Sequence, residues 1–374
     1  MNFALSEEQQ LVQDSVARFV TDNYGLESRS TLAKSKLGFS EAHWQSMAEL
    51  GWFGLPFSEA DGGFGGTAVD TMVIMEQFGK GLVLEPYFAS IVLAGSALRH
   101  ADHPQLVAQW LPSVIDGSKR LTLAWAEEQS RFDMHDVLTS ATASDGVYVV
   151  NGTKSMVPNA AGADALITSV RLSGSQTDST GIGLLVIDAA SDGISFDHFP
   201  TIDGGRASHV TFKDVKVSHD ALLVGGDHGH HVLAQVSTDA TLALCAEALG
   251  CMEVLYKDTV AYTQEREQFG HSLAEFQVLQ HRMVDMFMEY EQCKSLLYRA
   301  TLEVAQGLPS AERSVHALKY MIGKNGTFIG ENAVQLHGGM GMTEELRLGH
   351  YFKRLLVIDA QFGNADHHLQ KFAA

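Results

Sequence analysis

The sequence predicts an α+β protein with three parts: an N-terminal helical domain over residues 1–119, a middle antiparallel β-domain over 120–228, and a C-terminal four-helix bundle over 229–374. Two observations carry this prediction. Apolar residues recur at helical spacing up to about residue 118 and again from about residue 230, whereas the stretch between consists of short β-rich segments separated by turn residues. A chain of 374 residues is long enough to bury several such layers.

The N-terminal part opens with a helix start signal. Ser6 is followed three residues later by Gln9, as in a capping box, and the apolar residues after it keep the helical period. A second helix is expected to start the same way at Ser40. The glycine-rich stretch 51–66 is expected to be a loop, and a further helix is predicted from about 69 to 79.

The middle part contains short segments rich in β-branched and apolar residues. They are 121–126, 147–152, 165–170, 183–187 and 209–212. The run 174–181 is rich in Gly, Ser and Thr and is expected to be an exposed turn. In the C-terminal part, four long helical segments are predicted: roughly 231–267, 275–306, 310–337 and 344–371. Long amphipathic helices joined by short connections indicate a bundle.

The composition narrows the class of function. A formal net charge of −19 argues against nucleic acid, which requires Lys and Arg to replace counterions. The three cysteines lie in apolar helical context without a CxxC pair, so they are expected to be buried thiols in a reducing cytosol, not metal ligands. No signal peptide, membrane span or metal site is predicted, and the expected location is cytoplasmic.

Two late segments point to a bound cofactor. The first is Arg266-Glu267-Gln268-Phe269-Gly270, which offers a guanidinium for phosphate beside an aromatic ring. The second is Gln335-Leu336-His337-Gly338-Gly339-Met340-Gly341, in which three glycines let the backbone approach a flat or phosphorylated group. Taken alone, the first also fits a solvated helix-end cation, and the second a helix C-terminus with a flexible turn.

Together with the three-part plan, these segments resemble the acyl-CoA dehydrogenase family of flavoenzymes over essentially the whole chain. The stretch Asn151-Gly152-Thr153-Lys154 resembles a strand motif of its β-domain. The resemblance implies FAD between the β-domain and the bundle, a dimer of dimers, oxidation of an acyl-CoA thioester at Cα–Cβ, and electron-transfer flavoprotein as acceptor. It also implies that Arg266 and Phe269 contact FAD held mainly by a neighbouring subunit. Gln335, Gly338 and Gly339 are expected at its adenosine end.

The catalytic base departs from the family pattern. The two positions where members carry a glutamate are occupied here by Phe362 and Ala240. Glu247 is the remaining candidate, because it lies two turns after Ala240 on an otherwise apolar helix face, where desolvation suits a base. The alternative is a buried glutamate that forms a salt bridge with a neighbouring helix. The family's backbone N–H donor to the thioester oxygen corresponds to that of Phe362.

The expected surroundings of the flavin ring also depart from the family. A Thr that bonds the ring's pyrimidine end is replaced by Ala126. A Trp, and a Ser or Thr two residues later, are replaced by Met156 and Pro158. Proline has neither a hydroxyl nor an N–H to donate. These three residues are expected at the ring, without the three side-chain interactions that the family pattern places there.

The leading hypothesis is a FAD-dependent acyl-CoA dehydrogenase with Glu247 as base. Three features, the stretch 81–86, the turn Val157-Pro158-Asn159 and Glu247, resemble the small subunits of two-gene enzymes. Those enzymes act in β-oxidation-type degradation of bulky or dicarboxylic substrates, such as steroid side-chain or pimeloyl thioesters. A homo- or heterotetramer with a paralogous subunit is expected. The alternative is a non-catalytic partner subunit that completes the FAD site of a paralogous dehydrogenase. Arg131 and Arg206 are the nearby cations considered for CoA.

Overall fold

The computed structural model describes residues 4–374, and their contacts form two compact units. The bundle unit contains the chain up to Thr31, Thr67–Val83 and Thr241–Ala374. The sheet unit contains Leu32–Gly66 and Leu84–Ala240. The predicted domain boundaries at 119 and 228 were placed where the spacing of apolar residues changes between helical and β patterns, and they stay a prediction.

The bundle unit is built from long helices. They are α1 (Glu7–Asn23), α4 (Ala68–Gly81), the Thr241–Glu265 part of α7 (Gly229–Glu265), α8 (Gln277–Ala305), α9 (Ala311–His337), α10 (Leu348–Ala360) and α11 (Ala365–Ala373). A further helix, α2 (Leu26–Lys34), begins in this unit. Helix α9 packs against α8, α10 and α11, while α4 packs against α1 and α8. The capping box predicted at Ser6 is present: its side chain accepts from Gln9 N, and Gln9 reaches back to Ser6 N.

Helices α4 and α7 cross at two glycines. A Cβ on Gly79 would lie 1.9 Å from the carbonyl oxygen of Glu247, and one on Gly250 would lie 2.0 Å from that of Glu76. The thiol of Cys251 donates to the Gly79 carbonyl at 3.3 Å. Glycine is therefore needed at both positions so that the two backbones can approach this closely.

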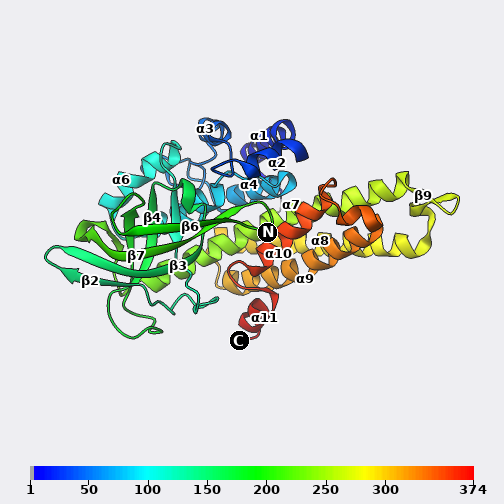
Figure 1. Ribbon diagram of the computed structural model, residues 1–374. Helices are drawn as coiled ribbons and strands as arrows, with labels where there is room; N and C mark the ends of the chain where they lie inside the picture. The colour runs from blue at the N-terminus through cyan, green and yellow to red at the C-terminus, as the bar shows by residue number, and fades with distance from the viewer. Residues whose placement is uncertain (1–3) are drawn as a thin grey trace. The chain divides into compact units, whose positions relative to one another are not determined.

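The predicted fourth long helix, 344–371, is wrong in one respect, because it is broken into α10 and α11 (Figure 1). The break follows from the backbone of Phe362 and Gly363, whose φ values are +56° and +108°. Asn364 then starts α11 as its N-cap by accepting from His367 N. A left-handed residue followed by a cap ends one helix and begins another.

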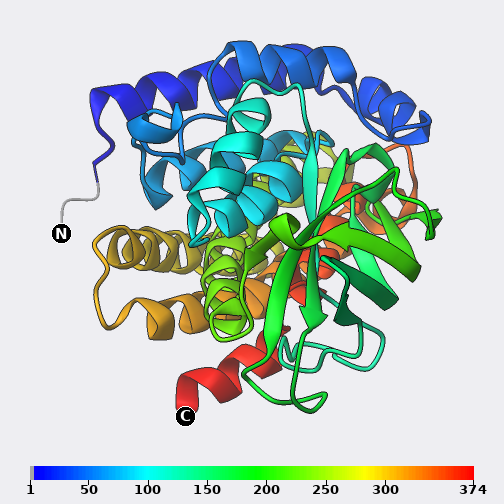
Figure 2. The ribbon, with the colours of Figure 1, turned by 90° about the vertical axis from the view of Figure 1, so that its left-hand side faces the viewer.

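The sheet unit contains one eight-stranded sheet in the order β6-β7-β3-β2-β4-β5-β8, with β1 paired to β4. The strands are β1 (Leu121–Ala124), β2 (Ser140–Ser144), β3 (Val147–Pro158), β4 (Ala165–Arg171), β5 (Ile182–Asp188), β6 (Ile194–Pro200), β7 (Arg206–Ser218) and β8 (Leu222–Val224). The pairing is antiparallel, as predicted, except that β4 runs parallel to β1 and to the end of β2. Figure 2 shows the twist of these strands as green arrows.

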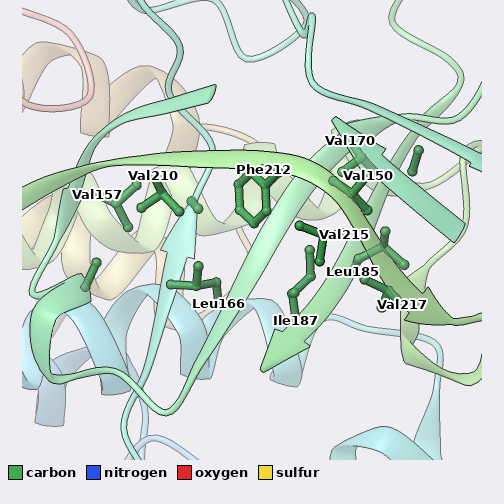
Figure 3. Packing of buried hydrophobic residues seen from close by; sticks show 13 residues of the cluster. Val150, Val157, Leu166, Val170, Leu185, Ile187, Val210, Phe212, Val215 and Val217 are labelled. Carbon is green, nitrogen blue, oxygen red and sulfur yellow. The ribbon is translucent and has the colours of Figure 1, made fainter. Parts of the chain in front are cut away.

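The apolar core of this sheet comes from side chains on its main strands (Figure 3). The labelled members are Val150, Val157, Leu166, Val170, Leu185, Ile187, Val210, Phe212, Val215 and Val217. The helices of the same unit are α3 (Glu41–Glu49), the π-helical turn η2 (Phe88–Ala94), α5 (Gly95–Arg99), α6 (Pro104–Ile115) and the Gly229–Ala240 part of α7. Short 3₁₀ turns complete the chain: η1 (Glu59–Asp61), η3 (Ala160–Gly162), η4 (His219–Ala221), η5 (Leu273–Glu275) and η6 (Gly338–Met342).

Helix α7 is long and apolar enough, by length and composition alone, to cross a membrane. Its most apolar stretch is 72% buried inside the protein, which is typical of a core helix in a soluble protein.

Candidate active site

Arg266 and Phe269 lie in a short hairpin after α7. Strands β9 (Glu267–Gln268) and β10 (His271–Ser272) are joined by Phe269 and Gly270, both with positive φ, as in the tight turns that match the twist of a hairpin. The turn presents the Phe269 ring to solvent, 90% exposed. The backbone of Arg266 is fixed between Tyr262 O and Leu273 N, while the residue itself is exposed.

Gln335, Gly338 and Gly339 lie at the end of α9, and all three are exposed. Gly338 has φ +59° and ψ −139°, a conformation that essentially only glycine adopts. A Cβ on Gly338 or Gly339 would meet nothing within 4 Å. The glycines are therefore not required for packing within this chain, and they leave the backbone open to an approaching group.

One aromatic stack brings these two segments together. The His337 ring lies on the Tyr262 ring of α7, with centroids 4.2 Å apart and planes 22° from parallel. His337 Nδ1 pairs with the Ala333 carbonyl at 2.8 Å, which holds the ring against the end of α9. The hairpin labelled β9 stands at the ends of α7 and α8 in Figure 1. We call Arg266, Phe269, Gln335, Gly338 and Gly339 the α7–α9 end.

The α7–α9 end fits one part of FAD. A guanidinium binds phosphate through paired N–H groups, an exposed aromatic ring offers a surface for a base, and open glycine backbone permits close approach. The exposed side chains of Met340 and Met342 extend the apolar surface beside the glycines. This arrangement suits the adenosine and pyrophosphate portion of a dinucleotide.

In the sheet unit, Ala126 and Met156 lie next to each other in the structure. Ser155 N donates to the Ala126 carbonyl at 2.8 Å, and the register of β3 against β7 shifts between Lys154 and Val157. Met156 sits in this bulge with φ +55° and is 54% exposed. Pro158 ends the strand, and its carbonyl accepts from Thr122 at 2.8 Å. None of these three side chains offers a hydroxyl or N–H.

A buried ion pair supports this segment. Lys154 Nζ donates to Glu127 Oε1 at 2.7 Å, to Ser169 Oγ at 2.9 Å and to the Trp125 carbonyl at 3.2 Å. Glu127 also accepts from the backbone N–H groups of Leu138 and Thr139. Burial alone would raise the pKa of Glu127, but Lys154, the Gln129 side chain and the Thr139 N–H outweigh it and lower that pKa to about 2.

Glu247 is buried and paired. Arg354 Nε donates to its Oε1 at 2.6 Å and Arg354 Nη2 to its Oε2 at 2.7 Å. The exposed fractions of the two side chains are 7% for Glu247 and 15% for Arg354. A two-pronged pair of this kind engages both carboxylate oxygens. It is the arrangement that the salt-bridge interpretation of Glu247 requires, and a role as base requires the carboxylate to leave the guanidinium.

The two family positions for the base carry no carboxylate here. Ala240 is fully buried. The carboxylate of Asp239 beside it is engaged elsewhere, because its Oδ2 pairs with Ser96, Arg99 and His100. Phe362 lies in the turn between α10 and α11.

The two arginines considered for CoA differ in availability. Arg206 Nη2 donates to the carbonyl of Ser35 at 2.5 Å, and its stem covers Gly38, so it is engaged in holding the chain at 33–38. Arg131 is exposed.

The sequence analysis did not single out Arg354, His316 or His368. Arg354 carries no local motif; it follows Lys353 and stands before an apolar stretch, Leu355-Leu356-Val357-Ile358, which is a weaker signal than the one that marked Glu247.

Comparison with known proteins identifies the class. Family models for the N-terminal, middle and C-terminal domains of acyl-CoA dehydrogenases match residues 6–118, 122–215 and 227–374, nearly the whole chain. The chain belongs to the acyl-CoA dehydrogenase family and is an oxidoreductase that acts on acyl-CoA. Its cofactor is FAD, and similar chains have been solved with FAD bound.

Three similar proteins span the chain. The short-chain-specific acyl-CoA dehydrogenase of Clostridium acetobutylicum is 26% identical over 382 residues, covering 98% of this chain and 97% of the relative. A variant of the Tcur3481–Tcur3483 steroid acyl-CoA dehydrogenase is 27% identical with a TM-score of 0.86, covering 98% and 97% of the two chains. The ChsE4–ChsE5 complex of Mycobacterium tuberculosis shares the fold at 24% identity, with a TM-score of 0.90 and 100% and 98% covered.

Proposed function

We propose that this chain is a subunit of a heterotetrameric, FAD-dependent acyl-CoA dehydrogenase that acts on a bulky or dicarboxylic acyl group, of the steroid side-chain or pimeloyl type. The observation that carries the proposal is the α7–α9 end, whose Arg266, Phe269 and open glycines suit FAD held mainly by a neighbouring subunit. The similarity to a steroid acyl-CoA dehydrogenase favours a bulky substrate. A cytoplasmic location and electron-transfer flavoprotein as acceptor complete the proposal.

Bound FAD supplies the hydride acceptor for the substrate Cβ. The residues of this chain do the rest. One oxygen of Glu247 releases its hydrogen bond to Arg354 and accepts the Cα proton. The guanidinium keeps its bond to the other oxygen and so holds the carboxylate in place. The Phe362 N–H binds the thioester oxygen and stabilises the negative charge that develops there. Arg266 would hold the cofactor's pyrophosphate.

A second function is favoured by one observation. Because both oxygens of Glu247 are bonded to Arg354, the carboxylate also suits a purely structural role. In that case the chain is a non-catalytic partner, which contributes the α7–α9 end to FAD bound by a paralogous dehydrogenase. The substitutions at Ala126, Met156 and Pro158 are consistent with this second function.

Visible absorption shows which chain holds the flavin, and bleaching of this chain alone by acyl-CoA excludes the non-catalytic function. The chain is purified alone and after co-expression with a paralogous subunit from a neighbouring gene. About one FAD per chain from this protein alone, with bleaching by acyl-CoA, supports a self-sufficient enzyme. Colour that appears only with the partner, at about half a FAD per chain, supports a shared site. A complex that binds no flavin in either form overturns the proposal.

Two matched variants test Glu247. If Glu247 is the base, Glu247→Gln abolishes substrate bleaching in a folded, flavin-containing protein, while Arg354→Lys keeps measurable bleaching because the carboxylate remains. If the Glu247–Arg354 pair is structural, both variants lower the stability by a similar amount. The bleaching rate then stays within about twofold of wild type, because a structural residue does not act on the transition state. Full activity in Glu247→Gln excludes the base role.

A further inference from the structure

The turn that carries Phe362 is held by side chains from other elements of the bundle unit. Lys319 of α9 is fully buried, and its Nζ donates to the carbonyls of Ile358, Asp359 and Gly363 at 2.8–2.9 Å. All three donors of the ammonium are thereby used. Lys319 thus fixes the end of α10 and the Gly363 side of the turn.

The Phe362 peptide is reached by a chain of two histidines. His368 of α11, 3% exposed, places Nε2 3.0 Å from the Phe362 carbonyl oxygen. Its Nδ1 lies 2.9 Å from Nδ1 of the half-buried His316 of α9. Gly363 permits this approach, since a Cβ there would lie 2.7 Å from His368 Nε2.

The Phe362 carbonyl sets the donor direction of both hydrogen bonds, from His316 to His368 and from His368 to Phe362. A carbonyl only accepts, so the proton of His368 lies on Nε2. Burial lowers the pKa of His368 to about 3, so the ring is neutral and its Nδ1 is a lone pair. His316 must therefore donate from Nδ1. Its Nε2 faces Glu312 at 3.8 Å, and Lys371 and His367 are the other titratable groups near it. Neutral or protonated, His316 keeps the Nδ1–H donor.

We propose that His368 and His316 are positioning residues, forming a directional chain from His316 Nδ1–H to His368 Nδ1 and from His368 Nε2–H to the Phe362 carbonyl. This chain fixes the left-handed Phe362 backbone and thereby the direction of its N–H. The inference rests on the proposed function, in which that N–H binds the thioester oxygen. The chain acts on the backbone at the position where other family members place a carboxylate, so it does not depend on the side chain at 362.

Kinetics of the assembled, flavin-containing enzyme test the role. His368→Phe keeps ring volume but removes the donor, and it is expected to lower kcat about tenfold to a hundredfold with a smaller change in KM, as for a weakened oxyanion donor. His368→Gln retains an amide donor and is expected to recover part of that loss. Glu312→Gln is the matched control: it changes only the carboxylate that faces His316 Nε2, and it is expected to keep the wild-type kcat. A kcat within twofold of wild type in folded His368→Phe overturns the proposal.

Histidine tautomers provide a readout that needs no substrate. Selective ¹⁵N labelling, with His368→Phe and His316→Phe to assign signals, is expected to show neutral His368 protonated on Nε2 and His316 protonated on Nδ1. A neutral His316 protonated only on Nε2 overturns the chain even if the enzyme is active. Absence of turnover in the unsubstituted complex overturns the proposed function instead. The tautomers then still test whether the His316–His368–Phe362 hydrogen bonds form.

Discussion

The two regions assigned to FAD by family resemblance differ in what they retain. The α7–α9 end keeps a cation, an exposed ring and open glycine backbone, and its side chains face outward. The segment around Ala126 and Met156 lacks the family's hydroxyl and indole groups, yet the buried Glu127–Lys154 pair beneath it is intact. The scaffold is thus preserved where the chemistry has changed. This difference favours a subunit that relies on a partner for part of one flavin site.

The largest expected effect tests whether that scaffold depends on its ion pair. Lys154→Met leaves the Glu127 carboxylate, 3% exposed, without its cation. Breaking a buried pair from one side costs about 3–5 kcal/mol, so the free energy of unfolding is expected to fall by that amount. Urea unfolding followed by circular dichroism measures it. The double variant Lys154→Met/Glu127→Gln is the control, expected to recover most of the loss. A single variant as stable as the double variant would contradict this account.

Acid should act on the same pair. The folded-state pKa of Glu127, about 2, lies below its ordinary value of 4.5, so the unfolded chain binds a proton first as the pH falls. The contribution of Glu127 is therefore present above about pH 4.5 and is lost between 4.5 and 2, for a total of about 3 kcal/mol. Unfolding measured across this window should show a shallower loss in Lys154→Met/Glu127→Gln than in the wild type. Identical slopes would contradict the assignment.

In the bundle unit, the close approach of α4 and α7 is the comparable test of packing. Gly79→Ala places a Cβ where the Glu247 carbonyl oxygen stands, 1.9 Å away, and overpacking of this kind costs about 1–3 kcal/mol. Gly349→Ala in α10 is the matched control. A Cβ there meets nothing within 4 Å, so alanine is expected to be neutral or to stabilise by up to about 1 kcal/mol. Thermal unfolding compares the two, and equal effects would argue against a tight crossing.

The sequence predicted the plan well because its signals are local. The Ser6 capping box, the turn composition around β strands and the helical period are all set by neighbouring residues, and each is present in the structure. The break at Phe362 was missed because a left-handed phenylalanine has no propensity signal. The turn is stabilised by side-chain bonds from His368, six residues on, and from Lys319, 44 residues before Gly363, which no local pattern reveals. The partner of Glu247 was missed for the same reason, since Arg354 lies 107 residues away.

The site residues divide along the same line. Motifs and family resemblance predicted Arg266 and the Gln335–Gly339 stretch as cofactor-binding residues, and the His337–Tyr262 stack joins the ends of the two helices that carry them. The sequence left two roles open for Glu247, and only side-chain geometry shows that both its oxygens are engaged. Periodicity finds a buried carboxylate, but it does not find the cation that a distant helix supplies.

The smallest expected effect sharpens the opening comparison directly. Ala126→Thr/Pro158→Thr introduces hydroxyls into the segment that lacks them, while Ala126→Val/Pro158→Val adds nearly the same volume without a hydroxyl. Both variants also gain the backbone N–H that Pro158 lacks, so they differ only in the hydroxyls. One added hydrogen bond is worth about 1 kcal/mol, so FAD affinity of the assembled protein is expected to rise about fivefold to tenfold in the threonine variant only. Flavin fluorescence titration measures the difference. Equal affinity in both variants would indicate that this segment does not face the ring, and the proposal of a shared flavin site would then rest on the α7–α9 end alone.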